Sequence, residues 1–96
     1  MLLEDLHHQK AAIDTIARQY GARRIRVFGS VARGQERLES DVDFLVDFPP
    51  GYDLFTQRLP LAERLAALVG RRVDLVPEHE LNCHFRQQML DEAAEL

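Results

Sequence analysis

The stretch DVDFLVDF, residues 41–48, restricts the fold of this chain more than any other. Its residues alternate in the way expected of a strand whose side chains point to opposite faces of a sheet. One face would be apolar and would carry Val42, Phe44, Val46 and Phe48. The opposite face would carry Asp41, Asp43, Leu45 and Asp47. The chain therefore needs a sheet that has a core on one side of this strand and acidic side chains on the other.

Helical and strand patterns occur on both sides of this strand. Apolar spacing predicts a helix over residues 2–20, a short helix opened by Ser30, a helix over 61–69 and a closing helix from about Asn82 onward. Alternation predicts two further strands over 24–28 and 72–76. The order helix, strand, short helix, strand, helix, strand, helix indicates an α/β fold built on a three-stranded sheet.

Length and composition favour one domain spanning residues 1–96. With 46% apolar residues the chain can build a core without a disulfide, and the single cysteine, Cys83, cannot form an internal one. No apolar run has the length of a signal peptide or a membrane span, so we expect a cytoplasmic protein without membrane contact. The formal net charge of −4 argues against direct binding of nucleic acid and leaves acidic metal sites open.

Three aspartates form the first candidate site. Asp41 and Asp43 point the same way from one strand, and Asp74 joins them if its strand is a neighbour. Converging carboxylates are costly unless a cation neutralises them, and oxygen ligands suit a hard divalent ion such as Mg²⁺. A pair of such ions can hold both oxygens of an in-line phosphoryl displacement. Asp47 lies about 13 Å along the strand from Asp43, as expected of a strand-end charge.

A glycine and a serine form the second candidate site. Gly29 ends the first strand, where a side chain would block the approach of a phosphate. Ser30 opens a helix whose free N–H groups attract an anion. Arg33, one turn later, has two interpretations: a phosphate ligand, or a surface arginine paired with Glu36 or Glu39.

Taken in order, these motifs resemble those of nucleotidyltransferases related to DNA polymerase β. The match consists of Gly29-Ser30, a ten-residue spacer, Asp41-Val42-Asp43 and later Val73-Asp74-Leu75. More narrowly, FGSVARG, SDVDFLVDF and GRRVDLV are similar to the minimal nucleotidyltransferases of two-gene toxin–antitoxin modules, over nearly the whole chain. A lone Asp-x-Asp would indicate only exposed acidic residues. The occurrence of Gly-Ser, Asp-x-Asp and Val-Asp-Leu in this order is specific for the family. The resemblance implies an α/β (α+β) minimal polymerase β-like fold with a three-stranded mixed sheet and about four helices.

The resemblance also implies a role for each motif residue. Gly29 and Ser30 would bind the β and γ phosphates of a nucleoside triphosphate, expected to be ATP. Asp41 and Asp43 would hold Mg²⁺ or Mn²⁺. Asp74 would ligate the catalytic metal and help to remove the proton of the attacking hydroxyl.

A partner follows from the same resemblance. With about twenty residues after Asp74, we expect another protein to supply the acceptor surface. The resemblance implies a HEPN-type RNase toxin whose tyrosine hydroxyl receives AMP, so that the chain acts as an antitoxin in a hetero-oligomer, or as a homodimer when isolated. Apolar residues that either dock this partner or belong to the core are Leu2, Leu3, Leu81 and Phe85. Two alternatives stay open: a non-catalytic antitoxin that inhibits by binding, and a nucleotidyltransferase that modifies a small-molecule hydroxyl.

Overall fold

The computed structural model describes residues 2–37, 40–81 and 86–96. Its sheet contains β1 (Ile25–Phe28), β2 (Val42–Val46) and β3 (Val73–Pro77) in the order β1-β2-β3. β1 pairs with β2 antiparallel, and β2 pairs with β3 in parallel. The expected three-stranded mixed sheet is thus confirmed, with the strand that carries Asp43 at its centre.

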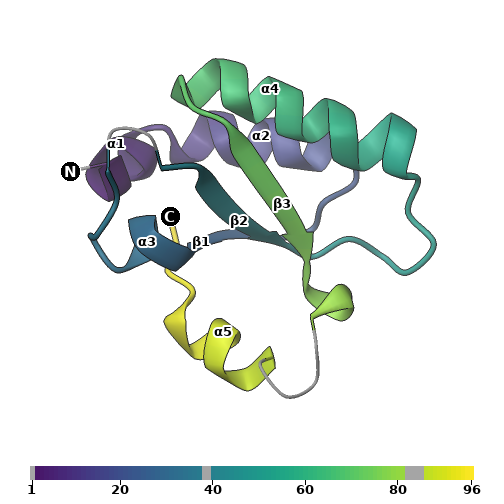
Figure 1. Ribbon diagram of the computed structural model, residues 1–96. Helices are drawn as coiled ribbons and strands as arrows, with labels where there is room; N and C mark the ends of the chain where they lie inside the picture. Colours follow the sequence, from purple (N-terminus) through teal and green to yellow (C-terminus); the bar gives the residue numbers. More distant parts are fainter. Residues whose placement is uncertain (1, 38–39, 82–85) are drawn as a thin grey trace.

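Five α-helices surround this sheet in the described part of the chain. They are α1 (Leu2–His8), α2 (Lys10–Gln19), α3 (Gly29–Ala32), α4 (Leu59–Val69) and α5 (Arg86–Glu92). In Figure 1, α2 and α4 run side by side along one face of the sheet, while α3 and α5 lie on the other side of it. None of the described helices is long and apolar enough to span a lipid bilayer.

The core lies between the sheet and the pair α2 and α4. The predicted apolar face of β2 is buried, with Val42, Phe44 and Val46 at 0% exposure and Phe48 at 1%. Helix α2 contributes Ile13 and Ala17, and α4 contributes Leu61 and Leu65. Burial of these side chains supplies most of the driving force for folding. It also fixes which face of β2 is left for the aspartates.

The helix predicted over residues 2–20 is wrong in one respect, because it is two helices. The backbone leaves the helical conformation at Gln9, where φ is −99° and ψ is 10°. The side-chain amide of Gln9 donates a hydrogen bond to the carbonyl of Leu68 at 3.4 Å, on the far end of α4. This contact between segments distant in sequence accompanies the break, and apolar spacing within the helix contains no sign of it.

Three further details differ from the sequence pattern. A single π-helical turn, η1 (Leu54–Arg58), precedes α4 and is capped by the Asp53 carboxylate, which accepts from the N–H groups of Phe55 and Thr56. Leu45, expected on the acidic face, is fully buried, so β2 is covered on both faces there. The closing helix α5 begins at Arg86, and Asn82 lies outside the described residues.

Candidate active site

The sheet brings Asp43 and Asp74 together. They are direct partners in the parallel register of β2 and β3, so their side chains leave the same face of the sheet on strands about 4.8 Å apart. In the antiparallel register Asp43 lies opposite Phe28, the last residue of β1. Two of the three expected carboxylates and the end of β1 therefore meet at one place.

Gly29 packs directly against this pair. Its φ is +74°, a conformation that favours glycine, and a β-carbon added there would lie 2.7 Å from Oδ2 of Asp43. The glycine turn thus passes so close to the carboxylate that no side chain fits between them. The sequence predicts close approach of a phosphate at Gly29, and in the structure Asp43 itself occupies part of that space.

Asp41 is near this pair but is otherwise engaged. It precedes β2, and its Oδ1 forms an ion pair with Nε of Arg72 at 3.1 Å. Within the described ranges, no three His, Cys, Asp or Glu side chains are grouped so that they could hold a metal ion. For Asp41 to join Asp43 and Asp74 around a cation, it must first leave Arg72.

The carboxylates of the site repel one another, and among the residues that the structure describes no nearby cation fully compensates their negative charge. Partial burial, and then the negative charges of Asp74 and Asp41, raise the pKa of the Asp43 carboxyl above its ordinary value. The nearby Arg33 cation lowers this pKa, but it does not cancel the increase. Ionised Asp43 is therefore less favourable here than in water, and a bound cation would remove that cost.

The donor set fits a divalent ion of the Mg²⁺ class. Its oxygens come from carboxylates, two of which stand side by side on neighbouring strands. Mg²⁺ is commonly held by one or two carboxylates together with substrate phosphates, so Asp43 and Asp74 provide a sufficient protein contribution. Asp41 would add a further oxygen after release from Arg72.

Ser30 lies in α3, which contains four residues. The first N–H groups of a helix lack intrahelical acceptors and can bind an anion, although the dipole of a single turn is small. Any phosphate binding here would therefore rest on individual backbone and hydroxyl donors next to Gly29.

Arg33 caps the end of α3 and is paired with a residue that the sequence pattern does not indicate. Its Nη1 lies 3.5 Å from Oε2 of Glu92 in α5, and its Nε donates to Oε1 of Gln35 at 3.2 Å. Glu36 instead accepts a hydrogen bond from the backbone N–H of Leu2 at 3.1 Å. The alternative in which Arg33 pairs with Glu36 is wrong, and Glu39 lies outside the described residues.

The same sheet face carries a second charged pair that the sequence did not indicate. Arg26 of β1 lies beside Leu45 in the register, is 8% exposed and pairs through Nη2 with Glu78, just after β3. The Nε of Arg26 has no hydrogen-bond partner. A buried arginine within a strand gives no local signal, because its partner is 52 residues away.

The apolar residues proposed to dock a partner are not the exposed ones. Leu2 and Leu3 pack partly buried against the core, Leu81 is half-buried, and Phe85 lies outside the described residues. Large apolar side chains that are exposed in the described part of the chain are Leu54, Phe55 and Leu59, at the start of α4 and in the turn before it.

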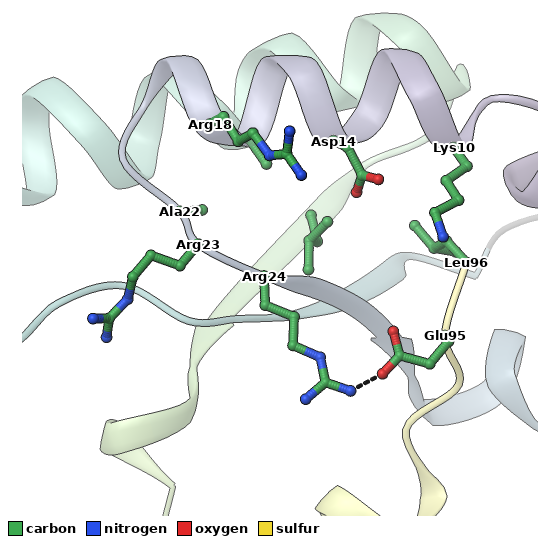
Figure 2. Close-up of a pocket in the computed structure, with 10 residues that line it drawn as sticks. Lys10, Asp14, Arg18, Ala22, Arg23, Arg24, Glu95 and Leu96 are labelled. Atoms are coloured by element: carbon green, nitrogen blue, oxygen red, sulfur yellow. Dashed lines mark hydrogen bonds and ion pairs between the residues drawn. The ribbon is translucent and has the colours of Figure 1, made fainter.

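A pocket of about 140 Å³ lies elsewhere, between α2, the start of β1 and the last residues of the chain. Figure 2 shows its charged lining, with the guanidinium of Arg24 directed at Glu95. None of the six expected site residues lines it. The candidate site is therefore the carboxylate face of the sheet.

Comparison with known proteins agrees with the geometry. The family model described as nucleotidyltransferase domain matches residues 10–95. The chain is 43% identical over 74 residues to the protein adenylyltransferase MntA of Thermococcus cleftensis. The aligned region covers 77% of this chain and 74% of the relative. A solved structure assigned as a minimal nucleotidyltransferase has a TM-score of 0.86 and 44% identity, and covers 100% of this chain and 97% of that one. A crystal structure of a toxin–antitoxin with AMP-PNP has a TM-score of 0.71 and 28% identity, and covers 84% of this chain and 66% of that one.

Proposed function

Because this chain belongs to the nucleotidyltransferase domain family, we propose that it transfers AMP from ATP to a hydroxyl group of a toxin protein and thereby acts as the antitoxin. The observation that carries the proposal is the contact of Gly29 with Asp43, which is itself the register partner of Asp74. It brings the turn that we assign to phosphate binding next to the paired carboxylates. A phosphoryl-transfer site needs both.

The turn formed by Gly29 and Ser30 would bind the nucleotide. The backbone at Gly29 and the hydroxyl of Ser30 would donate hydrogen bonds to the β and γ phosphates of ATP. Arg33 would add a cationic donor one turn further along α3. The AMP-PNP in the similar toxin–antitoxin structure supports ATP as the substrate. Asp41, Asp43 and Asp74 would hold Mg²⁺, or Mn²⁺, against the same triphosphate.

The carboxylates would carry out the chemical step. When bound, the metal supplies charge neutralisation on the triphosphate and lowers the pKa of the acceptor hydroxyl. Asp74, exposed at the edge of the sheet, accepts the proton of that hydroxyl. The hydroxyl oxygen forms a bond to the α phosphorus, the bond from that phosphorus to the bridging oxygen breaks, and pyrophosphate leaves. The product is an AMP ester of the acceptor.

The acceptor that we propose is a tyrosine of a HEPN-type RNase toxin in the cytoplasm, bound to residues 1–96 acting as a single nucleotidyltransferase domain. The similarity to a toxin–antitoxin structure supports a toxin partner. The exposed position of Asp74 supports a macromolecular acceptor, since a protein can approach the edge strand β3 without entering a closed pocket.

The test compares the wild-type chain with Asp74→Asn. Each is mixed with the co-encoded toxin, ATP and Mg²⁺, and the intact mass and the RNase activity of the toxin are followed. The wild type should add AMP to the toxin and leave it inactive after the two proteins are separated. Asp74→Asn keeps the shape of the side chain, so the complex should still form, while the rate of modification should fall by about a hundred- to ten-thousand-fold.

Three results would contradict the proposal in different ways. If both proteins silence the toxin equally and no adduct appears with any nucleotide, the chain inhibits by binding alone. If AMP is transferred to a small-molecule hydroxyl and never to the toxin, the acceptor class is wrong. If the adduct maps to a residue other than tyrosine, only the acceptor side chain is wrong.

A further inference from the structure

The residues that follow α5 are attached to the free edge of β1. Val27 and Ala94 exchange two backbone hydrogen bonds, of 3.1 and 2.7 Å, in an isolated antiparallel bridge. The carboxylate of Glu95 pairs with Arg24, as Figure 2 shows, and its carbonyl oxygen lies 3.0 Å from Nε2 of His7. These contacts hold the end of α5 beside the strand that leads into Gly29.

Glu92, the last residue of α5, meets Arg33 at this point. Because Nη1 of Arg33 faces Glu92 and Nε donates to Gln35, the guanidinium is held from two sides. A planar guanidinium held in this way presents its remaining N–H groups in a fixed direction, which suits a phosphate.

Arg33 also lies within the electrostatic influence of Asp43, yet it does not pair with it. Among the described residues its ion-pair partner is Glu92. Without Glu92, Arg33 would be drawn toward Asp43, the register partner of Asp74. An arginine that moved onto those carboxylates would occupy the place of the metal ion and would no longer face the triphosphate.

We propose that Glu92 is a positioning residue for the transfer reaction: it holds Arg33 beside the carboxylates, so that they stay open to a metal ion and the guanidinium stays open to the triphosphate. This inference rests on the proposed function, since it assigns Arg33 to the nucleotide. The bridge between Val27 and Ala94 is the feature that keeps Glu92 in place. Residues 92–94 and the turn at Gly29 are thereby held in a fixed relation to each other.

The solvent exposure of the pair formed by Arg33 and Glu92 distinguishes a positioning role from a role in stabilising the fold. The side chains of Arg33 and Glu92 are 47% and 40% exposed, and ion pairs with such access to water contribute little to stability. Loss of Glu92 should therefore leave the melting temperature almost unchanged. Its effect should appear in the binding of ligands.

The experiment measures two affinities of the full chain without the toxin: MgATP by titration calorimetry and Mn²⁺ by electron paramagnetic resonance. Glu92→Gln should weaken MgATP binding about three- to five-fold and should weaken Mn²⁺ binding in the absence of nucleotide. Asp91→Asn is the matched control, because it removes the same charge one residue earlier at a side chain that bonds to Gln87. It should change either affinity by less than about two-fold.

A double-mutant cycle makes the assignment to Arg33 specific. In an Arg33→Ala background, Glu92→Gln should change neither affinity further. Ala94→Pro, which removes the N–H that bonds to Val27, should reproduce the loss of MgATP affinity without altering any charge.

The inference is overturned if Glu92→Gln binds both ligands as well as Asp91→Asn does, or if its effect persists without Arg33. It is also overturned if Glu92→Gln binds MgATP more tightly than the wild type, since Glu92 would then compete with the triphosphate. If the wild type binds Mn²⁺ but no nucleotide, the proposed function fails, and the Mn²⁺ measurements alone decide the role of Glu92.

Discussion

A β-carbon on Gly29 would lie 2.7 Å from Oδ2 of Asp43, so the turn at Gly29 and the carboxylate of the central strand share one space. Gly29→Ala should lower the free energy of unfolding by about 1–3 kcal/mol, because it adds this clash to the cost of a positive φ. Gly70→Ala is the matched control, since its φ is +73° and nothing lies within 4 Å of the added carbon. Urea unfolding should show the larger loss for Gly29→Ala. Equal losses would mean that Asp43 can move aside freely.

Asp43→Asn should stabilise the metal-free fold. Because the pKa of Asp43 is raised in the folded chain, the free energy of unfolding falls as pH rises from about 4, the ordinary range of aspartic acid, through the raised value, and stays lower at neutral pH. The amide removes this penalty, by on the order of 0.5 kcal/mol. Melting in EDTA should show the advantage of the variant near pH 7 and its disappearance in acid. A large drop in melting temperature at neutral pH would instead identify Asp43 as a hydrogen-bonding residue of the fold.

Arg72→Gln should tighten the binding of Mn²⁺. It frees Asp41 from an ion pair whose partners are 85% and 45% exposed, and competition from such a pair is worth at most about 1 kcal/mol, or about five-fold in affinity. Arg64→Gln, the same change on the exposed side of α4, controls for the loss of one positive charge. Weaker Mn²⁺ binding in Arg72→Gln would show that Arg72 orients Asp41 for the metal.

Glu78→Gln should destabilise the fold by about 2 kcal/mol, because it leaves the charge of Arg26 buried without a counterion. Adding Arg26→Met should restore most of this loss, since an apolar side chain of similar length then fills the same place. Glu95→Gln, which breaks the exposed pair with Arg24, should cost less than about 0.5 kcal/mol. Urea midpoints measure all three. No recovery in the double variant would indicate that Glu78 has another structural role.

The part of the site that lies on β2 could be predicted because strand side chains alternate. Placing Val42 and Phe44 in the core sends Asp43 to the opposite face whatever the rest of the chain does. The positive φ of Gly29 follows a similarly local rule, since the strand must turn there. Its contact with Asp43 depends on the register of β1, which no local pattern contains.

The contacts between distant segments could not be predicted. Glu92 meets Arg33, and Gln9 meets Leu68, across separations of 59 residues, and nothing in the neighbouring sequence of either pair specifies its partner. Arg72 pairs with Asp41 because the parallel pairing of β2 and β3 places their starts together. Of these three contacts, only the pair of Arg72 and Asp41 follows from the order and register of the strands.

Strand β2 is paired along both edges and buried on both faces around Leu45. The amide protons of such a strand exchange with solvent only when the whole domain unfolds, unlike those of a loop, which opens locally. Since Asp43 belongs to this strand, its backbone position persists for as long as the native state does. Adjustment to successive substrates is then left to the side chains around it, and amide exchange should find β2 among the slowest parts of the chain while α3 exchanges early.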